Sequence, residues 1–174
     1  MELVFYIASA VAVISTIMVI TRLNAVHALL YLIVSLLAVA VIFFILGAPF
    51  IAALEVIIYA GAIMVLFIFV VMMLNIAEAT DQERSWLKPG GWVGPSVLVA
   101  ILFFPFIFNV AKFGNQQFSA GVIDPQQVGS TLFGPYLIGV ELSAMLLLAG
   151  IIGAYHLGRR KKKARHRFME GAEE

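Results

Sequence analysis

Long uncharged stretches dominate the pattern of hydrophobic and polar positions along the chain. Charged residues are absent from 3–21, 23–54, 56–77, 89–111, 125–140 and 142–158. A helix needs about 20 mainly apolar residues to cross the hydrocarbon core of a bilayer, and a helix satisfies its own backbone there. The pattern therefore predicts an all-α integral membrane protein with five transmembrane helices, at about 3–21, 27–46, 51–74, 92–111 and 135–158.

The segments between these spans are polar or rich in turn-forming residues. Gly47, Ala48 and Pro49 are typical of a tight turn. Residues 75–91 and 112–134 are expected to be loops, the second of them on the outer side and containing Gln, Gly and Ser. We therefore expect residues 1–158 to form one five-helix membrane domain and residues 159–174 to form a tail.

The basic residues predict the orientation of the helices in the membrane. Seven of the eleven Lys and Arg residues lie between Arg159 and Arg167, and basic segments next to spans favour the cytoplasmic side. Five crossings then place the N-terminus outside, in the periplasm, and the C-terminus in the cytoplasm. In this arrangement Arg22, Arg84 and Lys88 also face the cytoplasm. The basic tail would attract anionic lipid.

Composition narrows the classes of function. The chain has 174 residues, of which 63% are hydrophobic and 12% charged, and its mean hydropathy is +1.05. Soluble domains are far more polar, so a water-soluble enzyme or a nucleic-acid-binding protein is disfavoured. The chain contains no cysteine, which excludes disulfides and cysteine-ligated iron–sulfur clusters. We expect this chain to bind no metal or redox cofactor.

Two carboxylates fall inside the predicted spans. Glu55 lies in the third span and Glu141 in the fifth. A charge that faces lipid is costly, so intramembrane carboxylates usually face a bundle interior, a wet cavity or a partner. Either glutamate could exchange a proton with a chain of water molecules. Either could equally form fixed hydrogen bonds in a scaffold.

The middle of the third span is the most unusual local sequence. Tyr59 follows Glu55 by four residues and shares its helical face, and Ala60, Gly61 and Ala62 come next. Three small residues allow another helix to pack closely. Glycine also makes local rewinding easier, and π-bulges are frequent at functional sites. The pattern alone leaves both interpretations open.

A polar stripe marks the second predicted helix. His27, Tyr31 and Ser35 are spaced by four residues. Such stripes more often form hydrogen bonds between helices than proton paths, so we expect the stripe to join helices.

Several of these segments resemble a known family. Residues 24–32 (NAVHALLYL) and 54–67 (LEVIIYAGAIMVLF), continuing to Asn75, resemble subunit J of the proton-pumping NADH-quinone oxidoreductase, respiratory complex I. Residues 86–89, 132–136, 140–142 and 145–150 look like its bacterial members. The resemblance runs from about Phe5 to Gly158, and the third-helix motif is its specific part.

The resemblance implies a subunit of the membrane arm in the bacterial inner membrane, near the quinone-binding region and in contact with other membrane-arm subunits. The complex would use NADH, FMN, iron–sulfur clusters and quinone on or between other chains. In this family the third helix switches between α and π forms and gates a hydrated proton path. The positions that match this switch are Tyr59, Ala60, Gly61, Ile63, Met64 and Val65.

Two alternatives share part of this pattern. A homologous subunit of a cation/proton antiporter or of a membrane-bound hydrogenase would carry similar buried glutamates and a similar third helix. A purely structural membrane scaffold would use the same polar residues only to join helices. Co-purification with flavin and iron–sulfur subunits favours complex I, whereas dry and fixed glutamates favour the scaffold.

Overall fold

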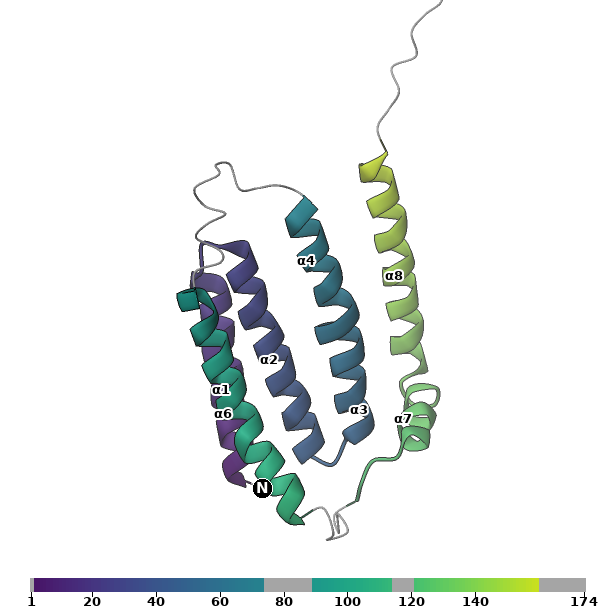
Figure 1. The fold of residues 1–174 in the computed structure, drawn as a ribbon. Coiled ribbons are helices and arrows are strands. Elements are labelled where there is room, and N and C mark those ends of the chain that lie inside the picture. Colours follow the sequence, from purple (N-terminus) through teal and green to yellow (C-terminus); the bar gives the residue numbers. More distant parts are fainter. Residues whose placement is uncertain (1, 74–88, 114–120, 160–174) are drawn as a thin grey trace, which may run out of the picture. The chain divides into compact units, whose positions relative to one another are not determined.

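The fold is built from helices, most of them long (Figure 1). A computed structural model describes residues 2–73, 89–113 and 121–159. All regular structure in these ranges is helical: α1 (Glu2–Thr21), α2 (Ala25–Ile45), α3 (Pro49–Leu54), the π-helix η1 (Glu55–Ile63), α4 (Met64–Met73), α6 (Pro89–Phe113), α7 (Pro125–Leu132) and α8 (Leu137–Gly158).

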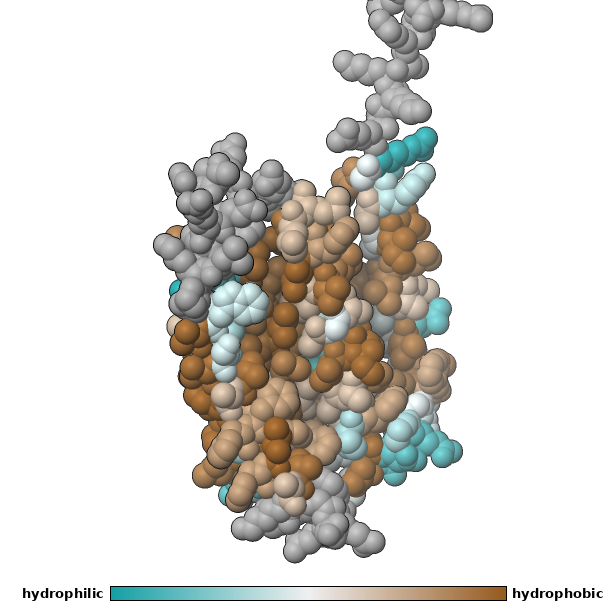
Figure 2. Space-filling model, in the orientation of Figure 1, coloured by the Kyte–Doolittle hydropathy of each residue, from teal (hydrophilic) through white to brown (hydrophobic). Residues whose placement is uncertain are grey.

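Five helical stretches are long and apolar enough to cross a membrane, which confirms the predicted number of spans. They are Glu2–Thr21, Ala25–Ile45, Pro49–Met73, Trp92–Ala111 and Leu137–Gly158. Figure 2 shows hydrophobic side chains covering the helices between their ends. The orientation relative to the two sides of the membrane stays a prediction. Most of the predicted inner loop and nearly all of the basic tail lie outside the described residues.

The predicted loop at residues 112–134 contains a helix that the sequence pattern missed. Residues 112–134 were expected to be a loop, but α7 spans Pro125–Leu132. Its proline stands at the start of the helix, where a missing N–H costs no hydrogen bond. The Ser130 and Thr131 hydroxyls both donate to the Gln127 carbonyl oxygen, at 3.0 and 2.7 Å. A search for long apolar stretches cannot find a polar helix of 8 residues.

The fifth span begins two residues later than predicted. Residues 133–136 form a turn, and α8 starts at Leu137 with Tyr136 at its N-cap. The ring of Pro135 disfavours an α conformation for the residue before it. The Tyr136 N–H donates to the Thr131 carbonyl at 3.3 Å, within the turn that precedes α8.

The chain divides into two compact units, residues 1–125 and residues 126–174. In the first unit, α1 packs against α2 through a stripe of buried residues with helical spacing. α6 packs against both helices, and Leu102 is fully buried between them. The third span packs against α2. The core of this cluster is Val4, Ala8, Val11, Val34, Ala38, Val41 and Leu102.

The turn between α2 and α3 follows the predicted Gly-Ala-Pro sequence. Gly47 has a φ of 83°, in the left-handed region that glycine tolerates best. The Ala48 N–H donates to the Phe43 carbonyl at 3.0 Å, and the Gly47 N–H donates to the Phe44 carbonyl at 3.1 Å. These two bonds form a Schellman motif. Pro49 then starts α3, where its missing N–H is not needed.

One aromatic contact joins three helices near the start of α2. Tyr31 is buried, and its hydroxyl occupies the space beside Gly94 of α6 where any other residue would carry a side chain. Arg22, just after α1, places its guanidinium 5.4 Å from the centre of the Tyr31 ring. Its Nη2 also lies 3.5 Å from the hydroxyl. This contact therefore fixes α6 against both α1 and α2.

Substituting Gly94 with alanine tests this contact. The new Cβ would collide with the Tyr31 hydroxyl, and overpacking of this kind costs about 1–3 kcal/mol. We expect Gly94→Ala to lower the thermal stability of the assembled protein. Adding Tyr31→Phe, which removes the colliding oxygen, should restore part of the loss in a double-mutant cycle. Additive effects of the two substitutions would contradict the contact.

A π-helical segment in the third span

The third span changes helix type in its middle. α3 leads into the π-helix η1, and α4 completes the span. The Met64 N–H reaches the Tyr59 carbonyl five residues earlier, as well as that of Gly61. The i→i+5 bond is the mark of a π-helix, which is rare and usually only one turn long. A π segment of 9 residues at this place is therefore the most distinctive feature of the described backbone.

Gly61 leaves room for a close backbone contact within the π segment. A Cβ built at this position would lie 3.1 Å from the carbonyl oxygen of Val56, five residues earlier. That spacing is tighter than ordinary van der Waals contact. The absence of a side chain at Gly61 thus relieves a contact that the wider π turn creates.

The predicted site residues of the third span differ in how deeply they are buried. Glu55, Ala60 and Gly61 are half-buried, and Met64 is buried. The side chains of Tyr59, Ile63 and Val65 are exposed, Tyr59 by 49%. The π segment packs on α2. The span therefore has one face on α2 and another face open to lipid or to a partner.

The π segment overlaps the positions that the family resemblance indicates. Tyr59, Ala60, Gly61 and Ile63 lie inside η1, whereas Met64 and Val65 form the start of α4. η1 begins four residues before Tyr59, at Glu55. The carboxylate thus stands at the junction between the α and π forms.

Glu141 belongs to the second unit. It lies in the first half of α8, where its side chain is exposed. The nearby Ser143 hydroxyl donates to the Gly139 carbonyl at 2.8 Å, as is usual for serine within a helix. An exposed carboxylate on an apolar helix needs a polar partner when that helix lies in the membrane.

A group of hydroxyls joins α1 and α2 near the middle of both helices. The Thr16 hydroxyl donates to the Ala12 carbonyl at 2.8 Å, and the Ser35 hydroxyl lies 2.9 Å from the Thr16 oxygen and 3.3 Å from the Ala12 carbonyl, so it can donate to either. Together with the contact between Arg22 and Tyr31, this confirms for Tyr31 and Ser35 that the polar stripe on the second helix joins helices. Ser15 Oγ is buried beside this group without a partner among the described residues. The sequence pattern had not singled out Ser15 or Thr16.

The described residues contain no group of three or more His, Asp or Glu side chains that could hold a metal ion. Their chemistry is that of helix packing, a half-buried carboxylate and a π-helical backbone segment. This defines a class: a multi-pass membrane protein whose third span carries a π-helical middle.

Comparisons with known proteins identify the family. A family model for NADH-ubiquinone/plastoquinone oxidoreductase chain 6 matches residues 15–157, and the chain belongs to this family. It is 55% identical over 168 residues to NADH-quinone oxidoreductase subunit J of Pseudomonas aeruginosa, covering 94% of this chain and 99% of the relative. Identity to the subunit J of Escherichia coli K12 is 52% over 163 residues, covering 93% and 89%. The chain is a multi-pass protein of the bacterial inner membrane.

Substitution of Gly61 by alanine should shift the third span toward the α form. The added Cβ crowds the Val56 carbonyl in the π form, and alanine is favoured over glycine within an α-helix by about 1 kcal/mol. Cryo-EM of the assembled complex should show a larger fraction of particles with an α-helical third span. The control is Gly150→Ala in α8, where a Cβ meets no atom within 4 Å. An unchanged π segment in all Gly61→Ala particles would refute this prediction.

Proposed function

We propose that this chain is a membrane-arm subunit of the proton-pumping NADH-quinone oxidoreductase, and that it helps couple electron transfer from NADH to quinone to proton translocation. The observation that carries the proposal is the π segment at the centre of the third span in a member of this family. Family membership favours this role over an antiporter or hydrogenase subunit. The extended π segment supports a gating role over that of a scaffold.

The proposed mechanism is a change of helix type in the third span. Conversion from π to α removes the extra residue of each wide turn, and a shift of one residue rotates the following positions by about 100°. Met64 is now buried and Val65 is exposed. Such a rotation would move the Met64 side chain away from its buried position and bring a neighbouring side chain toward α2. A hydrated proton path along this helix would open or close without movement of whole helices.

The side chains around the segment have proposed roles in that path. Glu55 stands half-buried at its start, and Tyr59 follows about one π turn later. Both can hold or pass a proton at an oxygen atom. Glu141 is proposed as a second polar station, on the fifth span. Ala60, Gly61 and Ile63 allow the backbone to change form.

The remaining chemistry is proposed to lie on other chains. NADH, FMN, iron–sulfur clusters and quinone would bind on or between the other subunits of a hetero-oligomer. This chain would contact other membrane-arm subunits. Its basic tail, which begins at Arg159, would attract anionic lipid on the cytoplasmic side.

Gly61→Val provides the main test. A branched side chain should block the π form, because even a Cβ is crowded there. We expect lower coupled quinone reduction and unchanged NADH oxidation with an artificial acceptor, both measured on the same membranes. Gly61→Leu should give the same two results. The control is Ala62→Val, at an exposed neighbouring position. Equal quinone reduction in Gly61→Val and wild type would contradict gating, and loss of both activities would indicate failed assembly.

A second test removes the charge from both membrane carboxylates. Glutamine keeps the shape of the side chain but cannot release a proton from a carboxyl group. In an assembled Glu55→Gln, Glu141→Gln variant, we expect fewer protons pumped per NADH oxidised, measured by quenching of a pH-sensitive dye in inverted vesicles. Full pumping in this variant would eliminate both glutamates as proton carriers.

A further inference from the structure

The two ends of the third span are held unequally. Ala48 and Ala52, at its start, are both buried. No residue of η1 is buried, and within α4 only Met64 is buried. A change of helix type turns one end of a helix relative to the other. The end with more fixed contacts therefore stays in place while the other end turns.

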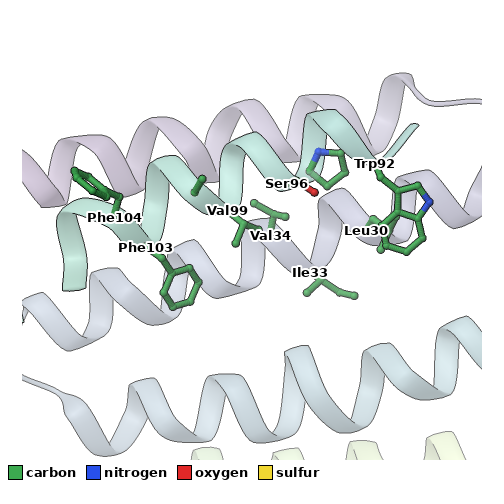
Figure 3. A pocket seen from close by; sticks show the side chains of 10 residues that line it. Leu30, Ile33, Val34, Trp92, Ser96, Val99, Phe103 and Phe104 are labelled. Atoms are coloured by element: carbon green, nitrogen blue, oxygen red, sulfur yellow. The ribbon is translucent and has the colours of Figure 1, made fainter. Parts of the chain in front are cut away.

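α2 provides a fixed base for the start of this span. Its core residues pack against α1 and against Leu102 of α6. Val34 of α2 and Phe103 of α6 also line one apolar groove between the two helices (Figure 3). Near the C-terminal end of α2, the Phe44 ring meets the Phe106 ring of α6 edge to face, with the centroids 5.3 Å apart. The end of α2 that leads into the third span is therefore fixed against α6.

Backbone hydrogen bonds hold the turn between α2 and α3 from two sides. The N–H groups of Gly47 and Ala48 donate back to carbonyls at the end of α2, at 3.1 and 3.0 Å. The Gly47 carbonyl takes no part in those two bonds. It accepts instead from the N–H of Ile123, at 2.9 Å. Because Pro49 begins α3 two residues after Gly47, this bond acts at the start of the third span.

The donor Ile123 belongs to a short strap, which we define as residues 121–124. The strap has no regular secondary structure and leads into α7, which begins at Pro125. It lies in the same compact unit as α2 and the third span. The N–H of the neighbouring Val122 makes no hydrogen bond with the residues that the structure describes. The bond from Ile123 is thus specific to one position of the strap.

We propose that Ile123 is a positioning residue of the third span. Its N–H holds the Gly47 carbonyl, so the start of α3 keeps its place when η1 changes form. The rotation then falls on the residues after η1, and the contact that breaks is that of the buried Met64 side chain. The place of the rotation rests on the proposed function, whereas the anchoring by Ile123 does not.

Ile123→Pro tests the anchor, because proline has no N–H to donate. In assembled complexes that still oxidise NADH with an artificial acceptor, we expect amide hydrogen exchange in residues 47–56 to rise about fivefold, the effect of one net backbone hydrogen bond. Exchange is measured by mass spectrometry. Two controls should match the wild type: Ile123→Ala, which keeps the N–H, and Val122→Pro, which removes an N–H without a partner. No rise in Ile123→Pro, or an equal rise in a control, would overturn the anchor.

The wild-type complex provides a measurement that needs no variant. After correction for intrinsic rates, the Ile123 N–H should exchange about fivefold more slowly than the Val122 N–H, because only the former is hydrogen-bonded. Fragmentation of the strap peptide in the mass spectrometer resolves the two amides. Equal rates would refute the bond.

Cryo-EM of the assembled complex shows where the rotation falls. Between wild-type particles with π and α forms of the third span, we expect Phe50 of α3 to keep its place and Val65 to turn. In Ile123→Pro, Phe50 should turn as well. Rotation of Phe50 in the wild type would contradict a fixed start. A single helix form in all wild-type particles would instead refute the proposed switch, and the exchange measurements would still decide the anchor.

Discussion

The rest of the structure depends on the fact that hydrocarbon cannot hydrogen-bond to the backbone. Every N–H and C=O group within a span must find its partner inside the protein. Helices satisfy this condition, and all five spans are helical. A π-helix satisfies it too, because each N–H still finds a carbonyl, five residues back instead of four. The proposed change of form in the third span would thus leave no backbone group unpaired, which a loop in the same place could not achieve.

The same constraint explains where polar side chains are placed. The hydroxyls of Thr16 and Ser35 lie 2.9 Å apart beside the Ala12 carbonyl, so both find hydrogen-bond partners within the protein, although Thr16 is exposed. Tyr31 lies buried beside Gly94, with Arg22 over its ring. These contacts hold α1, α2 and α6 together. The third span packs on α2 and keeps its other face open, which leaves it free to rotate in the proposed switch.

Two glycines of this chain have different roles, one in helix packing and one in the proposed gating. Gly94 makes room for a side chain from another helix, and its replacement would disturb helix packing. Gly61 makes room for a carbonyl of its own helix. Only the second contact depends on helix type. This difference connects the local sequence of the third span to the coupling role proposed for the chain.

The sequence by itself determined the helical class, the five spans and the turn at Gly47, because a long apolar stretch has few other stable forms in a bilayer. It also marked Glu55, because a charge is rare within a span, and Gly61, because it stands among three small residues in the middle of the span. Only the tertiary structure decided that Tyr31 meets Gly94, that Ser15 is buried, and that the π segment begins at Glu55. Those features depend on which helix faces meet and how the backbone accommodates them. Apolar periodicity carries no such information when nearly every face of a helix is apolar.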